Sequence, residues 1–319
     1  MLLACTVIIL GFILLVWGAD RFVDGASGLA KSFQIPPLVI GLTIVSLCTS
    51  LPEMLVAGVA AVDGNNNLGI GNAIGSNIAN IGLVLGITAL VAPLMVRSVL
   101  LRREMPVLFL VMFLALALMW DGNLSRMDGV VLLLGMVGLV YWLFRLGMQE
   151  RDALMEAEFT ENMPKNMSAR TSVMWLLVGL VVLLLSSRMV VWGAVEVATM
   201  LGVSDLVIGL TIVAIGTSLP ELVASVVSVL KNEADLAIGN IVGSNMFNTL
   251  AVLSMPALLA PNDFDAEILS RDIPVMFIFS LALLVMAYGF KRAGRISRVE
   301  GGLLLSGFSA YLYMLYVQA

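Results

Sequence analysis

The chain has 319 residues, of which 60% are hydrophobic and 12% are charged, and its formal net charge is −5. Soluble domains average roughly 45–50% apolar and about 25% charged residues, so the composition excludes an ordinary soluble domain and predicts an all-α polytopic membrane protein. There is no histidine, and the two cysteines, Cys5 and Cys48, lie in separate apolar segments. This argues against a histidine-based metal site, a histidine proton relay and a disulfide framework.

Apolar runs of about 20 residues, the length that crosses a bilayer, recur from end to end and predict ten transmembrane helices. Their approximate bounds are 2–26, 36–61, 67–91, 104–120, 127–147, 171–199, 204–230, 235–259, 272–290 and 298–317. The first run lacks the basic start and the cleavage site of a signal peptide, so we expect it to remain as a helix. We divide the chain into a first five-helix half (1–148), a Glu-rich linker (149–170) and a second five-helix half (171–319).

The basic residues predict the orientation. If the N-terminus lies outside, the odd-numbered loops and the adjoining helix ends hold all but three of the 17 basic residues, the exceptions being Arg126, Arg188 and Arg271. Basic residues concentrate on the cytoplasmic side of a membrane protein. We therefore predict a protein of the cell inner membrane with both termini periplasmic and the linker cytoplasmic.

Three segments occur twice at a constant offset of 168 residues. IGLTIV at 40–45 recurs at 208–213, TSLPE at 49–53 recurs at 217–221, and IGNAIGSN at 70–77 recurs as IGNIVGSN at 238–245. Five predicted helices, an odd number, separate equivalent points, so the two copies (about 40–86 and 208–254) should cross the membrane in opposite directions. Inverted repeats of this kind are typical of secondary transporters whose substrate site lies between the repeats at the midplane.

Each TSLPE segment places a proline and a glutamate inside an apolar helix. Pro52 and Pro220 cannot donate a backbone hydrogen bond, so each is expected to free carbonyl groups one turn earlier. A proline kink alone would explain the prolines and threonines. It would not explain Glu53 and Glu221, because a charged residue within the membrane is costly and is a candidate functional residue.

The second repeated motif, GNxxGSNxxN, forms a polar stripe. Asn72, Ser76 and Asn80 are four residues apart, as are Asn240, Ser244 and Asn248, so each trio lies on one helical face. The motif's glycines are better explained as a packing seam between helices. For Ser76, Asn80, Ser244 and Asn248 we favour ion binding, because they recur beside a carboxylate that needs a partner.

The candidate metal ligands are therefore all oxygen donors: Glu53, Glu221, Thr49, Ser50, Thr217, Ser218, Ser76, Ser244, Asn80 and Asn248. Oxygen donors of this kind suit Ca²⁺ or Na⁺ and not the softer metals. Two carboxylates balance one divalent ion. Without a cation the two would repel each other, so we expect the empty site to be short-lived or protonated, which favours exchange of one cation load for another.

The doubled pattern resembles the alpha-repeats of the calcium/cation antiporter superfamily, and most closely the prokaryotic sodium/calcium exchangers. The resemblance covers essentially the whole chain. It implies that the second, third, seventh and eighth helices enclose the ions, while the first and sixth slide across them in alternating access. It further implies that several Na⁺ exchange for one Ca²⁺, that Glu53 and Glu221 bind calcium, and that Asn80 and Asn248 form the central polar pair. Sodium contacts would come from Thr49, Ser50, Ser76, Thr217, Ser218 and Ser244.

Two positions depart from the family pattern. Some members have an aspartate where this chain has Asn248, and the amide argues against the potassium-dependent branch and against proton coupling inferred from acid-rich relatives. Cys48 stands where the second copy has Gly216 and where the family usually has glycine. A side chain there is expected to narrow the approach to the site or to alter ion preference.

The sequence thus predicts a Na⁺/Ca²⁺ antiporter, with the lipid bilayer and the two transported ions as its partners and no further cofactor or obligatory protein partner. A Ca²⁺/H⁺ antiporter is the first alternative, because paired glutamates can bind protons. A cation channel with rings of glutamate is less consistent with inverted repeats and broken helices. An intramembrane enzyme is the remotest alternative, since no nucleophile is paired with a base.

Overall fold

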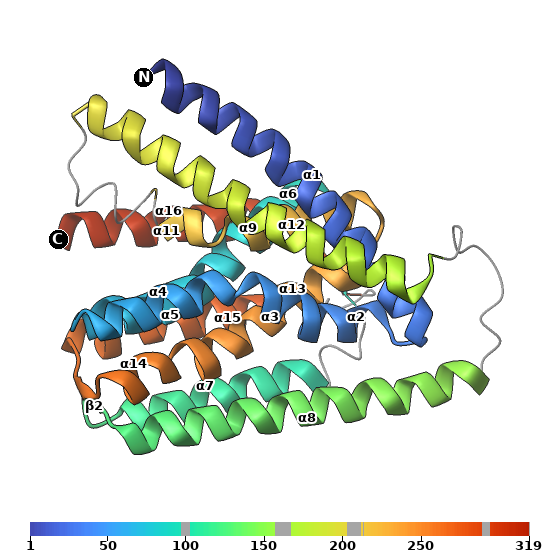
Figure 1. Ribbon diagram of the computed structural model, residues 1–319. Coiled ribbons are helices and arrows are strands. Elements are labelled where there is room, and N and C mark those ends of the chain that lie inside the picture. Colours follow the sequence, from blue (N-terminus) through green and yellow to red (C-terminus); the bar gives the residue numbers. More distant parts are fainter. Residues whose placement is uncertain (97–102, 157–166, 203–211, 213, 289–293, 319) are drawn as a thin grey trace.

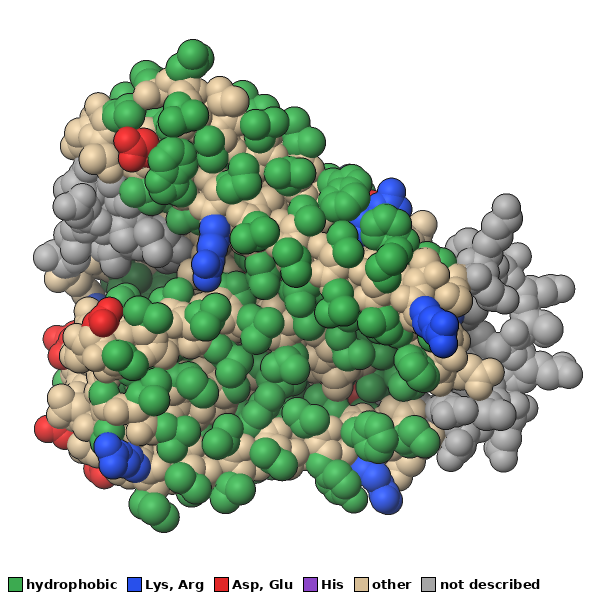
Figure 2. All heavy atoms as spheres, viewed as in Figure 1, with side chains coloured by type: hydrophobic (Ala, Val, Ile, Leu, Met, Phe, Trp, Pro, Cys, Tyr) green, Lys and Arg blue, Asp and Glu red, His purple; other side chains and the backbone are tan. Residues whose placement is uncertain are grey.

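The computed structural model describes residues 1–96, 103–156, 167–202, 212, 214–288 and 294–318, and this part of the chain is almost entirely helical (Figure 1). By length and hydropathy, seven of its helical runs could each cross a membrane. They are Leu2–Phe33, Pro37–Val62, Asn66–Val91, Arg126–Gln149, Ala169–Met200, Ala234–Leu259 and Ile268–Tyr288. Hydrophobic side chains cover most of the face shown in Figure 2, with charged side chains mainly toward its ends. The chain is a multi-pass membrane protein.

The helices and strands of the first half follow one another in a fixed order, with π-helical turns written η. They are α1 (Leu2–Phe33), α2 (Pro37–Ile40), η1 (Gly41–Val45), α3 (Ser46–Thr49), α4 (Leu51–Val62), α5 (Asn66–Ala79), η2 (Asn80–Leu85), α6 (Gly86–Val91), β1 (Leu94–Met95), α7 (Met105–Met119), β2 (Asn123–Leu124) and α8 (Arg126–Glu156).

The described part of the second half follows the same order, with one further π-helical segment, η6, before α15. Its elements are α9 (Ala169–Met200), α11 (Ala214–Thr217), α12 (Leu219–Leu230), α13 (Ala234–Phe247), η5 (Asn248–Val252), α14 (Ser254–Leu259), β3 (Asn262–Asp263), η6 (Ile268–Asp272), α15 (Ile273–Tyr288), β4 (Arg295–Ile296) and α16 (Arg298–Gln318). The start of the seventh predicted span, 204–211, lies outside the described residues. The described part of that span is α11 and the short apolar helix α12.

Two helices run further than the sequence predicts. α1 continues beyond residue 26 to Phe33, where Gln34 adopts a left-handed conformation (φ 55°) and ends it. α8 continues to Glu156, so its last turns lie within the stretch predicted as linker. The predicted bounds followed apolar runs. In α8, good helix formers such as Glu, Arg and Met extend the helix beyond its apolar part, whereas the last turns of α1 are buried in the core that it shares with α9.

α1 and α9 form a long antiparallel pair that runs diagonally across the upper part of Figure 1. Small residues line their contact at seven-residue intervals, in each case at equivalent positions of the two halves: Ala4, Gly11, Gly18 and Gly25 on α1, and Ser172, Gly179, Ser186 and Gly193 on α9. A Cβ atom at Gly25 would collide with the backbone of Leu176, and one at Gly179 with the backbone of Phe22. Small residues thus allow the two backbones to touch, as in membrane helix pairs generally.

α1 is tied to the second half by an ion-pair network. Lys231, just after α12, contacts Asp20 Oδ1 at 2.7 Å and Asp24 Oδ1 at 2.5 Å. Arg21 lies 3.5 Å from Asp24 Oδ2, and the hydroxyl of Ser27 donates to Glu233 at 2.6 Å. Both aspartates are therefore paired, and they lie within α1, well before its end at Phe33.

Removing the central cation of this network should loosen α1. We expect Lys231→Met to lower the free energy of unfolding by about 1–3 kcal/mol, because two partly exposed carboxylates lose their main partner. The check is thermal unfolding of the purified protein in detergent. Lys31→Met, the same change at a lysine with no ion pair among the described residues, serves as the control and should cost less. If Lys231→Met combined with Asp20→Asn and Asp24→Asn is no more stable than Lys231→Met alone, the ion pairs are not the cause.

Two short antiparallel strand pairs connect the halves. β1 pairs with β4 and β2 pairs with β3, so each pair takes one strand from each half. The buried side chains form two apolar cores. The larger one includes α5, α7, α13 and α15, and the smaller one lies among α1, α9 and α12. The α1–α9 pair thus packs mainly on itself and, through the smaller core, on α12.

Candidate ion-binding site

Both TSLPE segments interrupt a helix, as the prolines predict. α3 ends at Thr49 and α4 begins at Leu51, with Ser50 between them near φ −80° and ψ 1°. In the second copy α11 ends at Thr217 and α12 begins at Leu219, and Ser218 has almost the same dihedral angles. Each proline occupies the first turn of the following helix, where its missing N–H is tolerated.

Each break places a glutamate in the protein interior. Glu53 and Glu221 are each only 1% exposed. Glu53 Oε2 and both carboxylate oxygens of Glu221 have no hydrogen-bond partner among the described residues, and no basic side chain of that part pairs with either. The two carboxylates are also close enough to repel each other. Buried charges in proteins are normally paired, so this arrangement calls for a cation.

The first break meets α13 of the other half. The Thr49 hydroxyl donates to Asn240 Oδ1 at 3.1 Å and lies 3.5 Å from the Ser244 hydroxyl. The second break meets the first half in turn, because α11 packs on α5 and α12 packs on η2. Side chains far apart in the sequence are thereby gathered at one level of the molecule.

The glutamates' own backbone is held by the polar stripes. Asn72 Nδ2 donates to the carbonyl oxygen of Glu53 at 3.1 Å, and Asn240 Nδ2 donates to that of Glu221 at 3.4 Å. Asn240 also donates to the Ser225 hydroxyl at 3.1 Å. Asn72 and Asn240 were recognised in the sequence as members of the stripes, but not as residues that fix the position of the carboxylates.

The other predicted ligands are buried close to the breaks. Ser50 and Ser218 are 0% exposed with hydroxyls that have no partner in the described part of the chain, and Ser76 is 5% exposed. Asn80 and Asn248 each begin a π-helical segment, η2 and η5. Such segments are frequent at functional sites because the wider turn redirects side chains and carbonyls. Thr217 is half-buried, so nine of the ten predicted ligands are fully buried.

The set contains two acids and no more. Among the described residues, no group of three or more His, Cys, Asp or Glu side chains is arranged so that it could hold a metal ion. The remaining oxygens come from hydroxyl, amide and backbone groups. Such a set suits Ca²⁺ or Na⁺, which accept neutral oxygen ligands in flexible geometry.

The two copies differ in how tightly their stripes are packed. A Cβ at Gly239 or Gly243 would collide with the backbone of α2 and η1, at 2.5 Å from Leu38 O and 2.8 Å from Leu42 Cα respectively. At the equivalent Gly71 and Gly75, a Cβ would have no described atom from outside its own helix backbone within 4 Å. The packing-seam interpretation therefore holds for α13 but not for α5, within the part of the chain that the structure describes.

Cys48 and Gly216, at equivalent positions, have different surroundings. Cys48 is half-buried and packs against the smaller core shared by α1 and α9. At Gly216 a Cβ would collide with the side chain of Val191 on α9. A cysteine is therefore accommodated in the first break, whereas the second break has no room for one.

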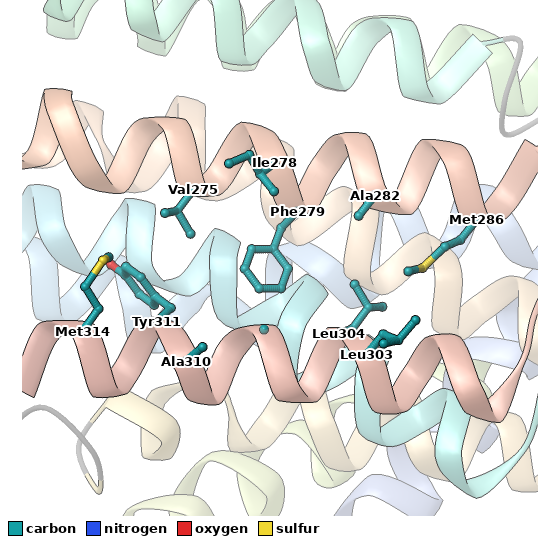
Figure 3. Close-up of a pocket in the computed structure, with 11 residues that line it drawn as sticks. Val275, Ile278, Phe279, Ala282, Met286, Leu303, Leu304, Ala310, Tyr311 and Met314 are labelled. Atoms are coloured by element: carbon teal, nitrogen blue, oxygen red, sulfur yellow. The ribbon is translucent and has the colours of Figure 1, made fainter.

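Two larger cavities lie outside the breaks. A polar one of about 640 Å³ reaches Asn67 and Gly71 on α5 and is lined by Asp265, Glu267 and Arg271 on the opposite side. An apolar one of about 400 Å³ lies between α15 and α16, with Val275 opposite Met314 toward one end and Met286 opposite Leu304 toward the other (Figure 3). Its one polar lining group is the Tyr311 hydroxyl, which donates to Asp272 at 2.9 Å. The apolar cavity lacks the oxygen ligands that a cation requires.

Sequence reasoning missed a further group behind the site. Asn77 and Asn245 bond across the two halves, and Thr249 lies between them. The two asparagines belong to the repeated GSN triplet, so the repetition could have identified them. Thr249 carries no such signal, because the first copy has Ile81 at that position.

Comparison with known proteins gives a consistent result. The family model described as "Sodium/calcium exchanger protein" matches residues 3–145 and 171–317. The chain is 46% identical to CaxA of Alkalimonas amylolytica, over 99% of both chains. It is 42% identical to the inner membrane protein YrbG of Escherichia coli K12 (99% and 98% covered) and 30% identical to the sodium/calcium exchanger MaX1 of Methanosarcina acetivorans (97% of both). A solved structure of the sodium-calcium exchanger NCX_Mj superposes with a TM-score of 0.83 and 33% identity over 98% of both chains.

Proposed function

This chain belongs to the sodium/calcium exchanger family, and we propose on that basis that it exchanges Na⁺ for Ca²⁺ across a bacterial inner membrane by alternating access. Members of the family are cation antiporters of the membrane and not enzymes. The relatives MaX1 and NCX_Mj are both named as sodium/calcium exchangers, and this chain matches each of them over nearly its whole length. This supports the choice of ions.

One observation carries the proposal: two buried glutamates, one from each break, have carboxylate oxygens without a protein partner in the described part of the chain. Two negative charges compensate one divalent cation. Sodium alone compensates both charges only if more than one Na⁺ binds, since a single Na⁺ leaves one charge uncompensated. This charge balance favours an exchange of several Na⁺ for one Ca²⁺.

The neutral oxygens provide the sodium ligands in this proposal. Ser50 and Ser218 have hydroxyls that point into the interior without a partner among the described residues. Thr49, Ser76, Thr217 and Ser244 lie on the same broken helices or on the stripes facing them, and Asn80 and Asn248 complete the set between the stripes.

The architecture that we propose has ten membrane helices in two inverted five-helix repeats. α4 and α12 are both 12 residues long, α5 and α13 are both 14, and each pair is 168 residues apart. The bonds from Asn72 to Glu53 and from Asn240 to Glu221 repeat at the same offset. The chain's two ends lie toward the same end of the molecule in Figure 1, and the distribution of basic residues favours periplasmic termini.

Access to the site is unequal on its two sides. The polar cavity of about 640 Å³ reaches α5, whereas the equivalent glycines of α13 are packed against α2 and η1. We propose that this form is open toward the cavity, which the orientation places on the periplasmic side. Asp265 and Glu267 in its lining would raise the local concentration of cations.

A Ca²⁺/H⁺ antiporter is the second candidate. It is favoured by the mutual repulsion of Glu53 and Glu221, which a bound proton would relieve when no metal ion is present. Asn248 counts against it, since this position supplies an amide and not a third acid.

Calcium flux in proteoliposomes distinguishes the two. We expect Ca²⁺ uptake into Na⁺-loaded vesicles to follow an outward Na⁺ gradient, to be electrogenic, and to persist when the pH gradient is collapsed with an ionophore. Vesicles loaded with choline in place of Na⁺ are the control. Uptake that ignores the Na⁺ gradient and follows the pH gradient would replace the sodium proposal with the proton one.

A further inference from the structure

Four asparagines behind the ion-binding site occupy equivalent positions in the two halves: Asn77 with Asn245, and Asn80 with Asn248. All four are at most 1% exposed. An exact twofold arrangement would therefore contain two equal cross-bonds, one from Asn80 to Asn245 and one from Asn248 to Asn77.

Only the first of these bonds is present. Asn80 Nδ2 donates to Asn245 Oδ1 at 3.1 Å. On the other side, neither Asn248 Nδ2 nor Asn77 Oδ1 has a partner in the described part of the chain. The asymmetry arises although the four asparagines lie on matching helices: α5 and α13 are both 14 residues long, and Asn80 and Asn248 each begin the π-helical segment that follows.

Thr249 accounts for the missing bond. Its hydroxyl donates to the carbonyl oxygen of Asn245 at 2.8 Å. A hydroxyl has one proton, so its oxygen can only accept from Asn77, which lies 2.8 Å away through Nδ2. The same nitrogen lies 3.3 Å from Met276 Sδ, so both of its protons have acceptors and the orientation of the Asn77 amide is fixed. The equivalent of Thr249 is Ile81, which has no hydroxyl.

Because the Asn77 amide is held by Thr249, the Asn248 amide lacks the hydrogen bond that the twofold arrangement would give it. Its side chain is 0% exposed, yet neither its oxygen nor its nitrogen has a hydrogen-bond partner among the described residues. It begins η5 one helical turn after Ser244, whose hydroxyl lies 3.5 Å from that of Thr49 at the first break. A buried amide without partners is costly, and an oxygen of this kind is a ligand for a hard cation.

We propose that Thr249 is a positioning residue: its hydroxyl holds the Asn77 amide and thereby leaves the Asn248 amide free to bind Na⁺. This inference rests on the proposed exchange of Na⁺ for Ca²⁺. Thr249 does not touch the ion. It acts through Asn77, and it breaks the symmetry of the site at one side chain, so that the halves offer the ion unequal ligands.

The test measures Na⁺ binding without transport. Purified protein in detergent is unfolded by heat at increasing NaCl, with choline chloride keeping the ionic strength constant, and the Na⁺ concentration that gives half of the maximal stabilisation is recorded. We expect Thr249→Val, which has nearly the same shape without the hydroxyl, to raise this concentration about tenfold, because Asn77 can then turn to Asn248 and occupy its amide. Thr249→Ser keeps the hydroxyl and should remain near the unmodified protein.

A further pair of variants tests the route through Asn77. Adding Asn77→Ala to Thr249→Val removes the amide that would capture Asn248, so the required Na⁺ concentration should fall back toward the original value. A role in packing alone would lower the unfolding temperature without Na⁺ and leave this concentration unchanged.

The outcomes separate the two proposals. If the unmodified protein responds to Na⁺ but Thr249→Val needs no more Na⁺ than it does, the positioning role is wrong and the proposed exchange stands. If Val and Ser raise the concentration equally, the hydroxyl is not the cause and the positioning role is again wrong. If Na⁺ does not stabilise the unmodified protein at all, both proposals are overturned.

Discussion

Glu53→Gln is expected to abolish Ca²⁺ transport while leaving the protein folded, and Glu221→Gln is expected to do the same. Glutamine keeps the shape of the side chain but removes one of two negative charges from a buried site. A unit charge about 4 Å from a cation contributes on the order of 4 kcal/mol at an effective dielectric constant near 20. This corresponds to a loss of roughly 10³-fold in affinity per unit of ionic charge.

The measurement is Na⁺-dependent ⁴⁵Ca²⁺ uptake in proteoliposomes, beside thermal unfolding of the same preparations. Because each carboxylate is repelled by the other in the empty protein, both variants should be at least as stable as the unmodified protein when no cation is added. Asp63→Asn likewise replaces a carboxylate by an amide, but at an exposed side chain, and it should transport normally. Near-normal exchange by both site variants would show that the carboxylates do not bind the transported ion.

Gly179→Ala is expected to destabilise the protein through the contact between α1 and α9. A Cβ at this position would collide with the backbone of Phe22 and lie 2.8 Å from Gly18 O, and backbone atoms cannot rotate away as side chains can. Overpacking typically costs about 1–3 kcal/mol. We expect the upper part of this range, reduced by the roughly 1 kcal/mol by which alanine is favoured over glycine inside a helix.

Gly138→Ala on α8 is the matched control. Gly138 is exposed, and no described atom lies within 4 Å of a Cβ at that position, so only the helical preference remains and the variant should be slightly more stable. The check is the unfolding temperature of both variants in the same detergent. Equal effects of the two substitutions would mean that the backbones of α1 and α9 do not constrain each other.

Two kinds of feature could be predicted from the sequence: those that occur in both repeated segments, and those that depend on residues unfavourable inside a membrane helix, such as proline and glutamate. Pro52 and Pro220 predicted the breaks in the helices, because a proline cannot complete the preceding turn. The glutamates beside them were predicted to be buried ligands, because a charge within the membrane needs a function or a partner. Their burial and lack of a protein partner among the described residues agree with that reasoning, whereas ion binding itself stays a prediction.

Other features depend on contacts between distant segments and could not be predicted from one sequence. Lys231 was counted only as a loop residue for orientation, and nothing in its neighbourhood indicates that Asp20 and Asp24 approach it from α1. Thr249 differs from Ile81 by a hydroxyl whose effect depends on where Asn77 lies. The end of α1 was placed too early for a different reason, because a helix that packs on a neighbour continues past its apolar run.

The small residues of the α1–α9 contact also limit how these helices can move. They recur every seven residues, which along a helix is about 10.5 Å at 1.5 Å per residue. If one helix moved along the other by a few ångströms, large side chains would face backbone where small residues now lie. The close contact between α1 and α9 can therefore form again only after a shift of a full seven-residue interval. Any sliding of these helices must therefore carry the two together, as one body, over the broken helices.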